Sequence, residues 1–134
     1  MSVPEPKSRI LIVDDDVSVA ESLGLIFEGR GYDVRRAYSA EDAIDLVAEW
    51  QPDAAILDVM LPRMSGIELA RAMGTAIPTC PVLLVSGHPG VEDMLTEAEA
   101  AGETYEILAK PLHPSLLLDR VAGLVSDMPV RAKA

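Results

Sequence analysis

The sequence predicts an α/β fold, a doubly wound parallel β-sheet with helices on both faces. Three observations lead to this prediction. First, four short apolar runs show no polar alternation, which is typical of strands that are buried on both faces. Second, the segments between these runs switch to a helical period. Third, strand and helix alternate five times with short connections, which gives right-handed crossovers and a parallel sheet covered by helices.

The strands are predicted from the apolar runs themselves. The four runs occupy residues 10–13, 54–57, 82–85 and 107–109. A weaker segment at residues 33–37 predicts a fifth strand, at the edge of the sheet.

The helices are predicted from apolar residues three and four positions apart. Residues 19–27 carry the first such stripe, and Gly29 follows it as a helix stop. Residues 43–48 carry the second, which Ser39 opens as an N-cap with Asp42 three residues on. Three further helices are expected at residues 67–73, 91–101 and 117–125.

Length and composition favour a single globular domain. The chain has 134 residues, of which 49% are hydrophobic and 25% charged. We expect a flexible N-terminal lead at residues 1–8, one domain at residues 9–126 and a C-terminal tail at residues 127–134. The lone Cys80 cannot form an internal disulfide, which favours a reducing compartment.

The charge excludes several classes of partner. Acidic residues outnumber basic ones by 22 to 11, so the formal net charge is −11. A surface this negative repels phosphate backbones and anionic lipids, and we expect no direct binding to nucleic acid or membranes. No apolar run approaches the roughly 18 residues that cross a bilayer, and residues 1–6 lack the apolar core of a signal peptide. We therefore expect a cytoplasmic protein.

Polar side chains follow four of the predicted strands. In open α/β sheets, ligands bind at the carboxyl ends of the strands, where the strand order reverses. The residues found there are Asp14, Asp15 and Asp16, then Asp58, then Ser86, then Lys110. Four strands that are distant in sequence thus end in side chains suited to one polar site.

These residue types favour phosphoryl chemistry. Carboxylates gathered at one edge repel one another unless a cation is present, and their hard oxygen atoms suit Mg²⁺. Lys110 adds a positive charge and Ser86 a hydroxyl donor. A carboxylate can also be the nucleophile that holds a phosphoryl group covalently.

Taken singly, each residue has a simpler explanation. Asp16 would cap the first helix, and Asp58, Ser86 and Lys110 would be ordinary turn or surface residues. Their coincidence at the ends of four strands favours a site. His88 and His113 have no second ligand at suitable spacing, so zinc is disfavoured.

The chain resembles the response-regulator receiver domains of two-component signalling over residues 9–125. The resemblance rests on four segments, Ile-Leu-Ile-Val-Asp-Asp-Asp at 10–16, Asp-Val-Met-Leu-Pro-Arg-Met-Ser-Gly at 58–66, Val-Ser-Gly at 85–87 and Lys-Pro at 110–111. It implies a five-stranded, flavodoxin-like fold of strand order 2-1-3-4-5, as in chemotaxis regulators.

The resemblance also implies a role for each site residue. Asp58 matches the aspartate that accepts a phosphoryl group from a sensor histidine kinase or a histidine phosphotransfer protein. Asp15 and Asp58 would bind Mg²⁺ directly, Asp14 largely through water, and Met60 through its backbone carbonyl. Ser86 and Lys110 match the hydroxyl and the lysine that contact the phosphoryl group, and the Lys110–Pro111 peptide would be cis.

Some positions depart from the family pattern. Ile107 stands where a Tyr or Phe commonly accompanies the movement of the hydroxyl, and Tyr105 lies two residues earlier on the same strand face. Leu112 replaces a frequent Phe. Met60 and His88 occupy positions that tune dephosphorylation in the family.

The expected role is that of a stand-alone receiver which signals to a downstream protein and catalyses only its own phosphorylation and dephosphorylation. Residues 87–109 contain six acids and no Lys or Arg, which favours a solvated face and protein partners over DNA. The first helix would expose Leu25 as a kinase-docking surface. Two alternatives stay open, a phosphatase of the haloacid-dehalogenase type and a receiver-like scaffold that works without phosphorylation.

Overall fold

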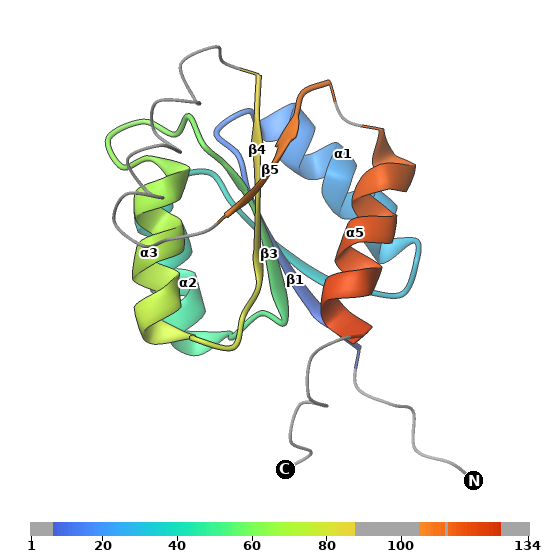
Figure 1. Cartoon of the computed structure of the whole chain (residues 1–134), viewed down its shortest axis with the longest axis horizontal. Helices are drawn as coiled ribbons and strands as arrows, with labels where there is room; N and C mark the ends of the chain where they lie inside the picture. The colour runs from blue at the N-terminus through green and yellow to red at the C-terminus, as the bar shows by residue number, and fades with distance from the viewer. Residues whose placement is uncertain (1–6, 88–104, 112, 127–134) are drawn as a thin grey trace, which may run out of the picture.

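The computed structural model describes residues 7–87, 105–111 and 113–126 of the chain (Figure 1). The elements in chain order are β1 (Arg9–Val13), α1 (Val17–Glu28), β2 (Asp33–Ala37), α2 (Ala40–Glu49), β3 (Ala54–Asp58), α3 (Gly66–Ala76), β4 (Val82–Ser86), β5 (Glu106–Ala109) and α5 (Pro114–Ser126). All five predicted strands and four predicted helices are therefore confirmed. The helix expected at residues 91–101, most of the N-terminal lead and the C-terminal tail lie outside the described residues.

The five strands form one parallel sheet in the order β2-β1-β3-β4-β5. This is the order that the family resemblance implies, with β2 at an edge as predicted. The chain leaves β1 toward β2 and then returns past it to β3, so the direction of winding reverses between β1 and β3. That reversal is where an open α/β sheet binds its ligands.

Helices cover both faces of the sheet, α1 and α5 on one and α2 and α3 on the other (Figure 1). Alternate residues of β1 belong to the two cores. Ile10 packs with Phe27 of α1 and Leu117 of α5, whereas Leu11 packs with Met73 of α3. All five side chains are at most 1% exposed, and each such burial contributes about 1.5–3 kcal/mol.

Three helices begin with a polar cap. In each, the side chain of the N-cap residue accepts a hydrogen bond from the backbone N–H three positions later, and the pairs are Asp16 with Val19, Ser39 with Asp42, and Ser65 with Glu68. Each cap contributes about 1 kcal/mol. The caps predicted at Asp16 and Ser39 are thus confirmed.

Two details differ from the predictions. Strands β3 and β4 each extend one residue further, so Asp58 and Ser86 are the last residues of their strands and do not merely follow them. Strand β5 is half-buried and Ala109 is exposed, because β5 lies at the second edge of the sheet; the expectation that this run is buried on both faces is wrong. Among the described helices, none is long and apolar enough to cross a membrane.

Candidate functional site

The carboxyl ends of four strands meet at one edge of the sheet. Asp14 directly follows β1, Asp58 ends β3, Ser86 ends β4 and Lys110 directly follows β5. The strands are in register there, with Asp58 opposite Val85. The four predicted strand ends therefore lie in neighbouring positions.

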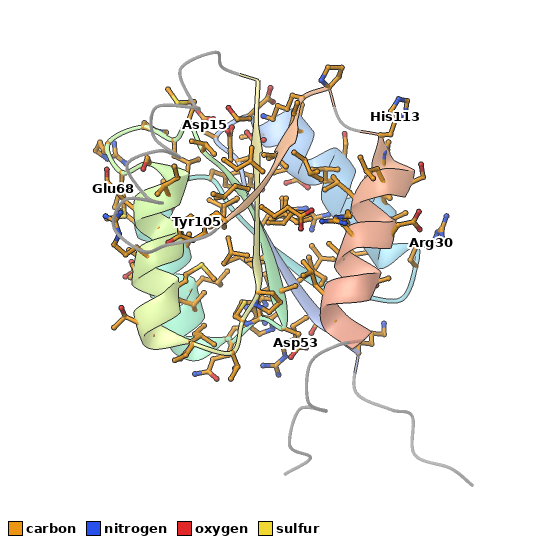
Figure 2. All side chains as sticks on the ribbon, viewed as in Figure 1. Asp15, Arg30, Asp53, Glu68, Tyr105 and His113 are labelled. Carbon is orange, nitrogen blue, oxygen red and sulfur yellow. The ribbon has the colours of Figure 1, made fainter. Side chains whose placement is uncertain are left out.

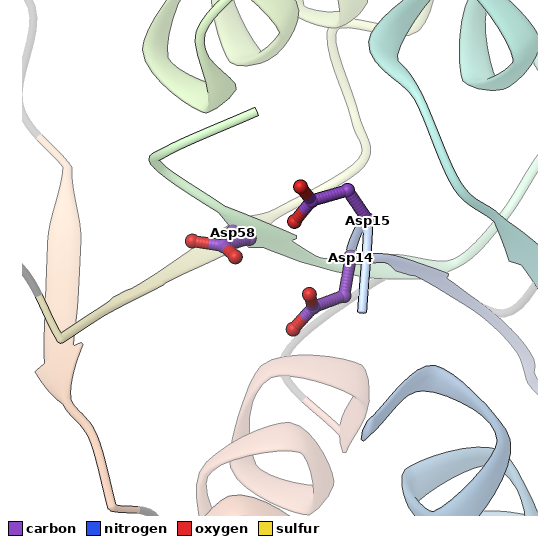
Figure 3. A group of neighbouring side chains, drawn as sticks. All are labelled: Asp14, Asp15 and Asp58. Carbon is purple, nitrogen blue, oxygen red and sulfur yellow. The ribbon is translucent and has the colours of Figure 1, made fainter. Parts of the chain in front are cut away.

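Three carboxylates form a cluster at this edge (Figure 3). Asp14, Asp15 and Asp58 each place a carboxylate oxygen within 4.8 Å of the others. Asp14 is 2% and Asp58 6% exposed, whereas Asp15 is exposed to solvent. The cluster therefore has a desolvated floor and one acid at its open side.

Lys110 connects the two buried acids. Its Nζ donates to Oδ2 of Asp14 at 3.1 Å and to Oδ2 of Asp58 at 3.3 Å. Its backbone N–H donates to the carbonyl of Ser86 at 2.9 Å, which extends the pairing of β4 and β5 beyond the strands. The Lys110–Pro111 peptide is cis, as the resemblance implies. Ser86 is buried beside these groups, with 6% of its surface exposed.

The site has more negative than positive charge. Burial raises the pKa of Asp58, and the charge of Asp14 raises it further, while the Met60 N–H and Lys110 act in the opposite direction. Burial alone would lower the pKa of Lys110, but the hydrogen bond to Asp14 and the two carboxylate charges outweigh it and raise that pKa. One ammonium thus faces three carboxylates, which leaves a formal charge of −2.

This donor set fits a hard divalent cation. Carboxylate oxygens that converge within a few ångströms and lack full charge compensation are the ligands that Mg²⁺ prefers. Asp16 is not part of the cluster, because its side chain caps α1 and its backbone N–H donates to Oδ1 of Asp14 at 2.9 Å. It helps to orient Asp14 and has the capping role that the sequence suggested.

The segment after Asp58 folds back onto the end of β3. The Met60 N–H donates to Oδ1 of Asp58 at 3.1 Å, and the Gly66 N–H donates to the carbonyl of Val59 at 2.8 Å. A Cβ atom at Gly66 would lie 2.1 Å from the carbonyl oxygen of Asp58. Gly66 is therefore required by close backbone packing, a role that the sequence did not reveal because the approach of Gly66 to Asp58 leaves no periodic pattern.

The aromatic residue considered as a replacement for the family's switch lies elsewhere. Tyr105 and Ile107 pack against the same core, as predicted. However, Ile107 is opposite Leu84 in the register, and Tyr105 precedes the first residue of β5. Tyr105 lines a recess with α3 and the start of β4 (Figure 2). Ser86 is opposite Ala109, at the other end of β5. His88 and Leu112 lie outside the described residues.

A groove runs beside the site between α1 and the start of α5. It has a volume of about 670 Å³ and is lined by residues of both elements together with Gly87, Lys110 and Pro111. Leu25 of α1 and Leu116 of α5 expose 67% and 45% of their surfaces. An apolar surface thus lies next to the lysine of the acidic site.

A doubly wound sheet with an acidic cluster and a lysine at its switch point defines the receiver class of signalling domains. The family model described as response regulator receiver domain matches residues 10–122. This chain belongs to that family.

Individual relatives agree with this assignment. The response regulator MprA of Mycolicibacterium vanbaalenii is 37% identical over 117 residues, and MprA of Mycobacterium avium is 36% identical over the same length. These matches cover 87% of this chain and 50% of each relative, so the chain spans about half the length of the curated relatives it matches.

Solved structures show the same fold. The CheY-like response regulator receiver domain protein of Methanospirillum hungatei superposes with a TM-score of 0.82 at 29% identity, over 91% of this chain and 96% of that one. Chemotaxis protein CheY4 of Vibrio cholerae superposes with a TM-score of 0.77 at 26% identity, over 89% and 99%.

Proposed function

We propose that this receiver, which we place at residues 9–126, accepts a phosphoryl group on Asp58 from a phosphohistidine. The observation that carries the proposal is the convergence of Asp14, Asp15 and Asp58 around Lys110 at the switch point of the sheet. Phosphoryl transfer needs mostly positioning and charge neutralisation, and this arrangement supplies both.

The transfer is a substitution at phosphorus. A carboxylate oxygen of Asp58 forms the new O–P bond while the N–P bond of the phosphohistidine breaks, and the donor imidazole keeps the electron pair and takes up a proton from solvent. Lys110 lies within hydrogen-bonding distance of Asp58 and donates to the bound phosphoryl group. Ser86, on the neighbouring strand, supplies a hydroxyl to the same group.

The acidic cluster would hold Mg²⁺ during this step. The ligands would be Asp14, Asp15 and Asp58, together with the backbone carbonyl of Met60. A cation bound there neutralises the charge of the transferring phosphoryl oxygens.

The groove beside the site is the surface that fits the phosphodonor. It reaches Lys110, and the helix α1 that lines it also exposes Leu25. A helix of a sensor histidine kinase or histidine phosphotransfer protein that docks on α1 would place its phosphohistidine near Asp58. Leu25→Asp is expected to slow transfer from the cognate kinase and to leave labelling by acetyl phosphate unchanged. If wild type and Leu25→Asp accept the phosphoryl group from the kinase at the same rate, Leu25 is not part of the docking surface.

We further propose that this chain passes its signal on by contact with a downstream protein. We expect this contact to take place in the cytoplasm, without direct binding to DNA or membranes. The support for this expectation is the net charge of −11, which disfavours anionic partners.

The decisive experiment is incubation with Mg²⁺ and acetyl phosphate, followed by intact-mass measurement of wild type and Asp58→Ala. We expect wild type alone to gain one phosphoryl group, and a chelator to prevent the gain. Equal mass gains for the two proteins, including no gain in either, would refute the proposal and favour the phosphorylation-independent scaffold. Multiple turnover of small phosphomonoesters would favour the phosphatase, which leaves Asp58 unexplained.

A further inference from the structure

The segment that joins β3 to α3 contains an unusual backbone conformation. Arg63 has a φ of 68°, in the left-handed region. This conformation is unfavourable for a residue with a Cβ atom, so contacts of the folded protein must hold it in place. One such contact is made by the neighbouring Met64, whose side chain packs against the core between α2, α3 and the sheet.

A second contact ties the same segment to α2. Nε of Arg63 donates to Oε2 of Glu41 at 3.1 Å, although the two residues are 22 positions apart. Glu41 lies in the first turn of α2. The hydrogen bond from Arg63 holds the pKa of Glu41 below its usual range, so the carboxylate is charged at neutral pH.

The position of this segment matters for the site because it contains Met60. The Met60 N–H donates to Oδ1 of Asp58, and the next backbone group along the chain is the carbonyl that we assign to the cation. The end near α3 is fixed by Gly66, which donates to Val59. Arg63 fixes the part between these two points.

We propose that Glu41 and Arg63 form a positioning pair, which holds residues 59–65 so that the backbone of Met60 stays beside Asp58 and thereby sets the affinity of the acidic site for Mg²⁺. This rests on the proposed function in taking Met60 as a cation ligand. Both side chains are partly exposed, at 44% and 71%. Exposed ion pairs are weak, so the pair modulates the affinity by roughly two- to fivefold.

The experiment compares Glu41→Gln, Arg63→Gln and the double variant with wild type in the full chain. Asp42→Asn is the matched control, because Asp42 also lies in the first turn of α2 and loses the same charge. Two quantities are measured without any phosphorylation: the Kd for Mg²⁺ by calorimetry, and the hydrogen-exchange rate of the amides at residues 59–64 in the absence of metal.

We expect each single variant to raise the Kd for Mg²⁺ roughly two- to fivefold and to accelerate exchange at residues 59–64. The double variant should match the single ones, because two partners of one contact are not additive. Asp42→Asn should change both quantities less than Glu41→Gln, because the charge of Asp42 acts on Arg63 less than the hydrogen bond and charge of Glu41 do. An additive double variant, or equal effects of Glu41→Gln and Asp42→Asn, would overturn the pair. Absence of labelling at Asp58 would refute the phosphoacceptor function and leave these two measurements to decide the pair separately.

Discussion

The two ends of the sheet differ in how their charged side chains are compensated. At the amino end, Trp50 is 6% exposed, and the guanidinium groups of Arg9 and Arg35 lie over its ring, with their central carbons 5.6 and 5.4 Å from the ring centroid. The backbone N–H of Arg9 also donates to Oδ2 of Asp53 at 2.8 Å. At the carboxyl end, Lys110 is the one cation of the described residues that pairs with the acidic cluster. Figure 2 labels Asp53 and Asp15 at these opposite ends.

This difference indicates that the charged side chains at the amino end stabilise the fold, whereas those at the carboxyl end form a binding site. The cations at the amino end stack on an aromatic ring, an arrangement that stabilises the fold and needs no ligand. The carboxyl end keeps two buried acids side by side with incomplete compensation, which costs stability in the absence of a cation. A site whose charges are left unbalanced in this way is poised to bind a cation and to accept an electrophile.

The largest expected effect is at the amino end. Trp50→Ala removes the ring that Arg9 and Arg35 lie over and should lower the free energy of unfolding by about 3–5 kcal/mol, measured by urea denaturation. Trp50→Phe keeps an aromatic face and should lose less than half as much. A loss below about 1 kcal/mol for Trp50→Ala would mean that the stacked cations add little to stability.

A bound cation should stabilise the protein through the carboxyl end of the sheet and not through the amino end. Mg²⁺ at 100 times its Kd should raise the free energy of unfolding of wild type by about 2.7 kcal/mol, because it binds the folded state. Thermal unfolding with Mg²⁺ and with a chelator measures the gain. Trp50→Phe should gain as much as wild type and Asp58→Asn clearly less; equal gains in all three proteins would place the cation elsewhere.

The close approach of Gly66 to the backbone of Asp58 can be tested by substitution. Gly66→Ala would push a methyl group against the carbonyl of Asp58 and should cost about 1–3 kcal/mol in the free energy of unfolding. Gly74→Ala in the same helix is the control, since nothing lies within 4 Å of the added Cβ. It should be neutral or stabilise by up to about 1 kcal/mol. Similar urea midpoints for the two variants would show that the close approach is unimportant.

The smallest expected effect is an increase in the free energy of unfolding. Asp58→Asn removes one of the repelling charges and should stabilise the metal-free protein by about 1 kcal/mol. The pKa of Asp58 is raised in the folded state, so the folded state takes up a proton before the unfolded chain does as pH falls. The advantage of Asp58→Asn over wild type should therefore shrink as the pH falls toward 3.8, the ordinary value. Urea denaturation across this range measures it, and a constant difference would contradict the pKa shift.

The sequence was sufficient for the strands, the four described helices and the acidic cluster; the helix expected at residues 91–101 stays a prediction. Buried parallel strands are continuous apolar runs, so the first polar residue after each run marks the sheet edge, which is how Asp14, Asp58, Ser86 and Lys110 were found. The approach of Gly66 to Asp58 and the contact between Glu41 and Arg63 were not found. Both contacts depend on the path of the loop between β3 and α3. Such a path leaves no periodic pattern in the sequence. The stacking of two arginines on Trp50 was missed for the same reason.

The positions of Asp58 and Ser86 inside their strands have a further consequence. Both residues belong to the hydrogen-bonded ladder, with Asp58 opposite Val85 and Ser86 opposite Ala109, and the Val59 N–H extends the ladder to the carbonyl of Val85. Their backbone atoms are thus held in place by hydrogen bonds to the neighbouring strands. The two side chains therefore reach the site from a backbone that the sheet itself holds in register.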